Sequence, residues 1–139
     1  MFFYPAVAAV GYNEKTCRRK KIPYRVASYA NALLPRAIAM RTLNGFVKII
    51  VSDDGRDRVL GMRAAGPQVS NTIMSISVLM ELDPHIQHML RLVYPHPTMS
   101  EGVQECLRLL RGELVYKPGI FPEHIKIRSW HPDASFQKK

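Results

Sequence analysis

Residues 45–65 read GFVKIIVSDDGRDRVLGMRAA and contain the clearest structural signal in the chain. Two runs rich in apolar and β-branched residues, 45–51 and 58–65, flank the polar segment 52–55. The Asp54-Gly55 step supplies the positive-φ positions that a turn between antiparallel strands needs. The stretch therefore predicts a β-hairpin.

The segments before the hairpin also favour strands. Residues 5–12, PAVAAVGY, predict a short buried strand that ends in a turn at Gly11, and residues 13–21 predict a polar helical turn or loop. Residues 22–30 alternate in polarity, which favours a second strand.

The periodicity changes after the hairpin. From Asn71, apolar residues recur at spacings of three and four, which predicts an amphipathic helix that ends near Pro84. A short helix is expected over 86–93, and another after Pro97. Strands followed by helices predict an α+β domain. The prolines and glycine after Gly112 predict an extended, loosely structured tail over 112–139, with an edge strand at 124–128.

Composition limits the possible functions. The 139 residues are 47% hydrophobic, which allows one domain with its own core and excludes disorder over the whole chain. The formal net charge of +9 favours a polyanionic partner without choosing between nucleic acid, an anionic membrane and an acidic protein. No apolar run approaches the roughly 20 residues of a membrane span. Residues 1–10 have no basic region before their apolar run, which Pro5 interrupts, so we predict a cytoplasmic protein.

Several kinds of site are disfavoured. Cys17 and Cys106 form no short metal-binding spacing, which excludes a disulfide scaffold and a zinc ribbon. Neither GxGxxG nor a P-loop motif occurs. His85 and His88 have helical spacing but no third ligand, so we expect exposed histidines and no metal site. The basic residues of 15–21 could contact phosphates, but without an aromatic platform they favour a solvated loop.

The most informative short segment is YPHPTMSE at 94–101. His96 lies between two prolines, which restrict its backbone, and Glu101 follows five residues later. Thr98 and Glu101 have the spacing of a helix-capping box, which needs no catalysis. Alternatively, Glu101 orients His96 and stabilises its protonated form, making an acid/base pair. The spacing favours the cap, although the two interpretations are compatible.

The segment HPTMSE also resembles the HPTxSE signature near the C-terminus of the pyridine nucleotide-disulfide oxidoreductases, which include dihydrolipoamide dehydrogenase, glutathione reductase and mercuric reductase. Further landmarks of this family occur in the same order. They are PAVAAVG at 5–11 with Glu14, Arg36-Ala37, GFVKI at 45–49, Leu60-Gly61 and Gly66-Pro67. The resemblance covers residues 5–110 and corresponds to the family's C-terminal dimerisation domain.

The resemblance implies an α+β domain in which helices pack on an antiparallel sheet. It assigns residues 1–111 to the dimerisation domain and leaves 112–139 as a C-terminal tail of unknown role. His96 would be the catalytic acid/base and Glu101 its orienting partner. His96 and Pro97, commonly joined by a cis bond, would lie near the flavin of the other subunit. A homodimer is implied, and we expect it to form through the helices around 71–90 and the segment around His96.

The resemblance further implies a parent enzyme, a disulfide or dithiol oxidoreductase most like dihydrolipoamide dehydrogenase, that uses FAD and NAD(P). The domains that bind those cofactors are not in this chain, so we expect the isolated domain to hold none and to be inactive alone. Asn71, Pro95 and the long tail depart from the usual family pattern. The pair of His96 and Glu101 favours a thiol or disulfide substrate over a metal ion. The alternative is a protein-interaction or basic nucleic-acid-binding module without catalysis.

Overall fold

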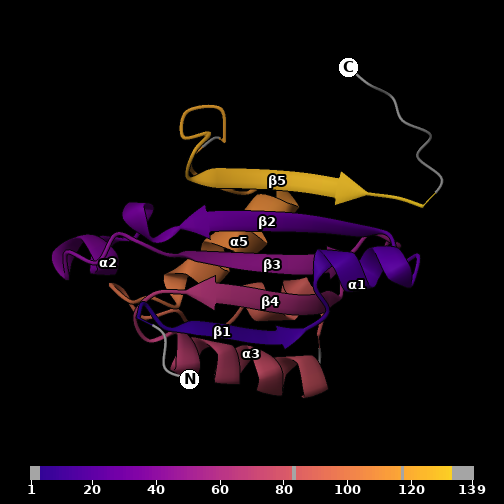
Figure 1. Cartoon of the computed structure of the whole chain (residues 1–139), viewed down its shortest axis with the longest axis horizontal. Helices are drawn as coiled ribbons and strands as arrows, with labels where there is room; N and C mark the ends of the chain where they lie inside the picture. Colours follow the sequence, from indigo (N-terminus) through magenta and orange to yellow (C-terminus); the bar gives the residue numbers. More distant parts are fainter. Residues whose placement is uncertain (1–3, 83, 117, 133–139) are drawn as a thin grey trace.

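An antiparallel sheet organises the computed structural model, which describes residues 4–82, 84–116 and 118–132. Its strands are β1 (Val7–Gly11), β2 (Tyr24–Ala30), β3 (Phe46–Ser52), β4 (Val59–Ala65) and β5 (Ile125–Trp130). Within these residues they pair in the order β1-β4-β3-β2-β5, and each neighbouring pair is antiparallel. Figure 1 shows β1 and β5 at opposite edges of the sheet.

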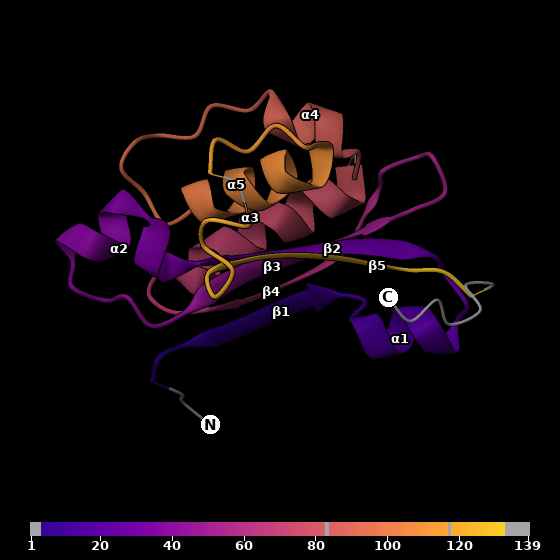
Figure 2. The ribbon, with the colours of Figure 1, turned by 90° about the horizontal axis from the view of Figure 1, so that it is seen from above.

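The helices cover the two faces of the sheet unequally. They are α1 (Glu14–Arg19), the 3-10 turn η1 (Asn31–Leu33), α2 (Pro35–Ala39), α3 (Val69–Leu82), α4 (Ile86–Leu90) and α5 (Glu101–Arg111). In Figure 2, α3, α4 and α5 lie on one face and α1 lies on the other. The predicted α+β class, with helices packed on an antiparallel sheet, is therefore confirmed. In the described part of the chain, no helix is both long and apolar enough to cross a membrane.

Both faces of β2 are buried, because helices pack on each side of it. Ala27 and Tyr29 belong to the large core beneath α3 and α5, while Tyr24 and Val26 pack with Cys17 of α1. The other cysteine, Cys106, lies in the large core. Burial raises the pKa of both thiols, so each cysteine remains uncharged and serves as a small apolar side chain.

The central hairpin forms as predicted, but its connection is longer than the expected turn at 52–55. Ser52 remains in β3, and its backbone N–H donates to the carbonyl of Arg58 at 2.8 Å. The positive φ angles occur at Gly55 and Asp57, and not at Asp54. The Arg25 guanidinium pairs with Asp57 and, at 3.3 Å, with Asp53. These contacts with β2 hold the wider loop in place.

The predicted edge strand is present in the tail as β5, displaced slightly toward the C-terminus. It pairs with β2 from Ile125 opposite Tyr29 to Trp130 opposite Tyr24. The rings of Trp130 and Tyr24 stack, with centroids 5.8 Å apart. The tail therefore contributes to the same sheet, while the division between 1–111 and 112–139 stays a prediction.

Glu14 attaches α1 to the sheet. One carboxylate oxygen accepts a hydrogen bond from Lys48 Nζ of β3 at 2.8 Å, and the other lies 3.4 Å from Arg128 of β5. Burial alone would raise the pKa of Glu14, but the hydrogen bond and charge of Lys48, together with Arg128 and Arg18, outweigh it and lower the pKa. The ionised carboxylate therefore stabilises the fold.

The substitution Glu14→Gln is expected to lower the free energy of unfolding by about 1 kcal/mol near neutral pH. Since the folded-state pKa lies below the unfolded one, the contribution of Glu14 is present above the unfolded pKa and is lost as pH falls through the folded pKa. Urea denaturation of both proteins across a pH series measures this. Glu113→Gln, at an exposed carboxylate, is the control. A stability difference that did not change in acid would contradict the role of the charge.

Candidate active site

The candidate site begins where α5 meets the sheet. Gly102, the second residue of α5, lies so close to β3 that an added Cβ would stand 2.9 Å from Val47 Cγ2 and 3.3 Å from Leu34 Cδ1. A larger residue would therefore push the first turn of α5 away from the sheet. Its neighbour Glu101 starts the helix and projects toward the preceding loop, where it meets His96. Sequence reasoning did not identify Gly102, because no periodic pattern reports close contact between a helix and a strand.

The Glu101 carboxylate bridges two groups of the loop. Oε1 accepts a hydrogen bond from His96 Nδ1 at 2.8 Å, and Oε2 accepts one from the backbone N–H of Thr98 at 2.7 Å. The Thr98 hydroxyl donates to the carbonyl of Pro95 at 2.8 Å. These bonds join both sides of the cis His96–Pro97 peptide to the start of α5.

Each carboxylate oxygen makes the contact that one of the two interpretations requires, while the acid/base role of the pair stays a prediction. The predicted capping box is only partly correct. The N-cap of α5 is Ser100 and Glu101 is its first residue, whereas the box placed Thr98 at the N-cap and Glu101 at the third helical position. The hydrogen bond from the Thr98 backbone N–H to Glu101 still forms, although Glu101 is the first residue of the helix, because the loop folds back over the first turn.

The exposure of the two side chains differs in a way that suits proton transfer. The His96 side chain is 66% exposed, whereas that of Glu101 is 16% exposed. Because the carboxylate accepts from Nδ1, it favours the neutral tautomer with the proton on Nδ1. The other ring nitrogen, Nε2, then carries the lone pair that can accept a proton from an outside group.

Tyr94 is the nearest other titratable group before His96 in the loop, and it has a structural role. Its hydroxyl donates to the carbonyl of Met89 at 3.2 Å, which ties the loop to α4. Burial raises the pKa of Tyr94 to about 12. The phenol therefore stays neutral near pH 7.

Other candidate groups have different surroundings. His85 Nδ1 lies 2.9 Å from the carbonyl of Arg56, and the rings of His85 and His88 are 6.1 Å apart. No group of three or more potential metal ligands occurs among the described residues. In the basic segment 15–21, Arg18 donates to the Tyr24 hydroxyl at 3.0 Å, and the Lys20 ammonium lies 5.2 Å from the centre of the Tyr12 ring.

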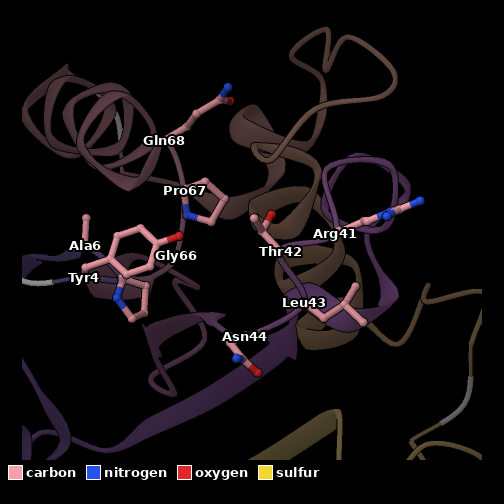
Figure 3. A pocket seen from close by; sticks show the side chains of 10 residues that line it. Tyr4, Ala6, Arg41, Thr42, Leu43, Asn44, Gly66, Pro67 and Gln68 are labelled. Atoms are coloured by element: carbon pink, nitrogen blue, oxygen red, sulfur yellow. The ribbon is translucent and has the colours of Figure 1, made fainter.

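A cavity of about 300 Å³ lies elsewhere, at the end of the sheet where β1 begins. Figure 3 shows Tyr4, Gly66 and Pro67 on one side of it and Thr42 and Leu43 on the other. Its lining contains one arginine and no acidic or histidine side chain, so it lacks an acid/base pair. The arrangement of His96 and Glu101 remains the candidate site.

Comparisons with known proteins identify the family of this chain. The model of the pyridine nucleotide-disulphide oxidoreductase dimerisation domain matches residues 1–107. The chain belongs to this family. Dihydrolipoyl dehydrogenase from Schizosaccharomyces pombe is 31% identical over 107 residues, which are 77% of this chain and 21% of that protein. Leghemoglobin reductase from Glycine max is 32% identical over 102 residues, which are 73% of this chain and 19% of that protein.

Solved structures share the dimerisation-domain fold. LpdA from Mycobacterium tuberculosis superposes with a TM-score of 0.72 at 24% identity, over 78% of this chain and 24% of that one. The HOCl-induced flavoprotein disulfide reductase RclA from Escherichia coli also gives 0.72 at 24% identity, over 77% and 24%. This dimerisation domain thus spans about a fifth of the length of the curated relatives that it matches.

The carboxylate of Glu101 should control the tautomer of His96 in this dimerisation domain. We expect Glu101→Ala to shift neutral His96 from the Nδ1–H form toward the Nε2–H form that predominates in free histidine, since the acceptor at Nδ1 is gone. Nitrogen NMR of the imidazole ring measures the two forms. Glu105→Ala, one turn further along α5, is the matched control. An unchanged tautomer in Glu101→Ala would contradict the assignment.

Proposed function

We propose that this chain is the dimerisation and acid/base domain of a FAD-dependent NAD(P)H disulfide or dithiol oxidoreductase, most like dihydrolipoamide dehydrogenase. The observation that carries the proposal is the exposed His96 imidazole held through Nδ1 by a mostly buried carboxylate, on a domain of this family. Relatives that are named dihydrolipoyl dehydrogenase support the substrate class. The domain alone is inactive, and the cytoplasmic location predicted from sequence stays a prediction.

The geometry suits His96 as the group that exchanges a proton with the thiol substrate. With Nδ1–H bonded to Glu101, Nε2 accepts the proton of the substrate thiol. The resulting thiolate attacks one sulfur of a disulfide, a new sulfur–sulfur bond forms, and the other sulfur leaves as a thiolate. In the reverse direction the protonated imidazole returns the proton. Glu101 stabilises the positive charge that His96 carries between these steps.

FAD and NAD(P), when bound to other domains of the enzyme, supply the electron transfer between nicotinamide and disulfide. The described residues of this chain fit a contact at the edge of the flavin. The side chain of His96 is exposed, and the following Pro97 has no backbone N–H that would need a partner there. His96 and Pro97 are therefore the residues of this chain that would contact the flavin of the other subunit.

An exposed apolar stripe supports the homodimer. Met74, Val78 and Leu82 of α3 are spaced four residues apart, so they lie on one face of the helix, and they are 64%, 44% and 77% exposed. Val93, near His96 in the chain, is 91% exposed. A second copy that packs on this face would remove the apolar surface from water, next to the loop that carries His96.

Val78→Asp is expected to weaken self-association of the chain at least tenfold, because it places a charge in the centre of the stripe. Sedimentation equilibrium over a concentration series measures this. Ser129→Asp, at an exposed position of β5 on the sheet edge opposite β1, is the matched control, because α3 packs on β1 and β4. A wild-type chain that stayed monomeric at all concentrations would argue against a dimer through α3.

Catalysis can be tested in a chimera in which residues 1–107 replace the matching region of the Schizosaccharomyces pombe dihydrolipoyl dehydrogenase. We expect His96→Gln to slow oxidation of dihydrolipoamide by about 100-fold or more, since the proton acceptor is lost. Reduction of the bound flavin by NADH should change little. Stopped-flow absorbance follows the two half-reactions separately.

Flavin content shows that the chimera has folded, and His88→Gln is the control histidine in the same domain. Equal losses in both half-reactions would reject His96 as the acid/base. A folded chimera that binds flavin but whose dithiol half-reaction is unaffected by His96→Gln would favour the alternative, an interaction module without catalysis.

A further inference from the structure

The outer edge of β5 lies outside the part of the chain that the family model matches. The match ends at residue 107, and β5 begins at Ile125. β5 pairs with β2 on one side and is last in the strand order, so its other side is an open edge of the described sheet (Figure 1). An open edge presents backbone N–H and C=O groups that another extended chain can pair with.

Two cations stand on one face of this edge. Lys126 and Arg128 are two positions apart in β5, so their side chains share one face of the strand. They lie opposite Ser28 and Val26 of β2. Among the described residues Lys126 forms no ion pair, while the 65% exposed Arg128 lies 3.4 Å from Glu14. Between them Ile127 points to the opposite face and is 43% exposed.

The cationic surface continues beside β5. A shallow hollow next to the strand is lined by Lys15 and Arg18 of α1 together with Arg128. Glu14 also lines it, but its carboxylate is already shared between Lys48 and Arg128. The charges of Lys48, Arg128 and Arg18 overcome the effect of burial on the pKa of Glu14, which lies below its usual value. The local electrostatic field thus favours an anionic group here.

A second copy of the chain fits this edge poorly. Two β5 strands that paired in antiparallel register would set Lys126 and Arg128 against the same cations of the other copy. Like charges directly opposite each other destabilise a strand pair, and basic residues on edge strands commonly prevent self-association in this way. The complementary occupant is an acidic strand.

We propose that the open edge of β5 binds an extended acidic segment of a partner protein by strand addition. Acidic side chains at alternate positions of that segment pair with Lys126 and Arg128, and an apolar residue between them packs against Ile127. Backbone hydrogen bonds supply part of the affinity, and the alternation of charge sets the register. A nucleic acid would use the same cations without needing this register.

The test uses the whole chain and a fluorescent peptide in which glutamate alternates with valine. A peptide of the same composition, with its glutamates in one block, distinguishes strand addition from simple charge attraction. We expect fluorescence anisotropy to show at least tenfold tighter binding of the alternating peptide. The double variant Lys126→Glu/Arg128→Glu should lose at least tenfold in affinity, because two attractive pairs become repulsive.

The double variant Arg19→Glu/Lys21→Glu makes the same charge change near the end of α1, and it should bind the alternating peptide within about threefold of wild type after correction for long-range attraction. N-methylation of alternate peptide amides on the pairing edge should abolish binding. Equal affinity for the two peptides, equal losses in both double variants, or tighter binding of a single-stranded RNA oligomer would overturn the proposal. Circular dichroism confirms that each variant has folded.

Discussion

The close approach of α5 to β3 is the constraint on which the described site depends. Gly102 allows the first turn of the helix to rest against Val47, and Cys106 reaches the carbonyl of Val47 one turn later, with its sulfur 3.4 Å away. The apolar face of α5 then fills the core above β2 and β3. Because this contact fixes the helix start, it also fixes the position of Glu101, and through the carboxylate the positions of His96 and Thr98.

The Glu101 carboxylate stabilises both the loop and the orientation of His96, using one oxygen for each. One oxygen closes the loop by binding Thr98 N–H, and the other holds the imidazole. A carboxylate that bonds both the backbone and the His96 side chain stays in place at little additional entropic cost, because the loop that orders it is already folded. The exposed ring is thereby positioned without being buried, which leaves its second nitrogen accessible.

On the other face of the sheet, a single carboxylate likewise has two partners. Glu14 accepts from Lys48 and lies near Arg128, so one carboxylate balances cations from β3 and β5 and holds α1 against the strands. Glu14 lines the hollow between α1 and β5 together with three cations, Lys15, Arg18 and Arg128. The α1 face of the sheet thus carries a smaller core around Cys17 as well as these exposed cations.

The sequence by itself determined the hairpin, the amphipathic helices and the restricted loop around His96 before the last helix. Strand alternation, helical periodicity and proline restrictions are local properties, which is why the sequence reveals them. It could not decide between a cap and an acid/base pair at Glu101, since both depend on where the loop folds relative to the helix. The length of the hairpin loop was also beyond sequence, because Arg25 of β2 pairs with Asp53 and Asp57 from a distant segment. Only the tertiary structure brought Gly102 against Val47 and placed β5 beside β2, since these contacts join residues far apart in the chain and leave no periodic signal.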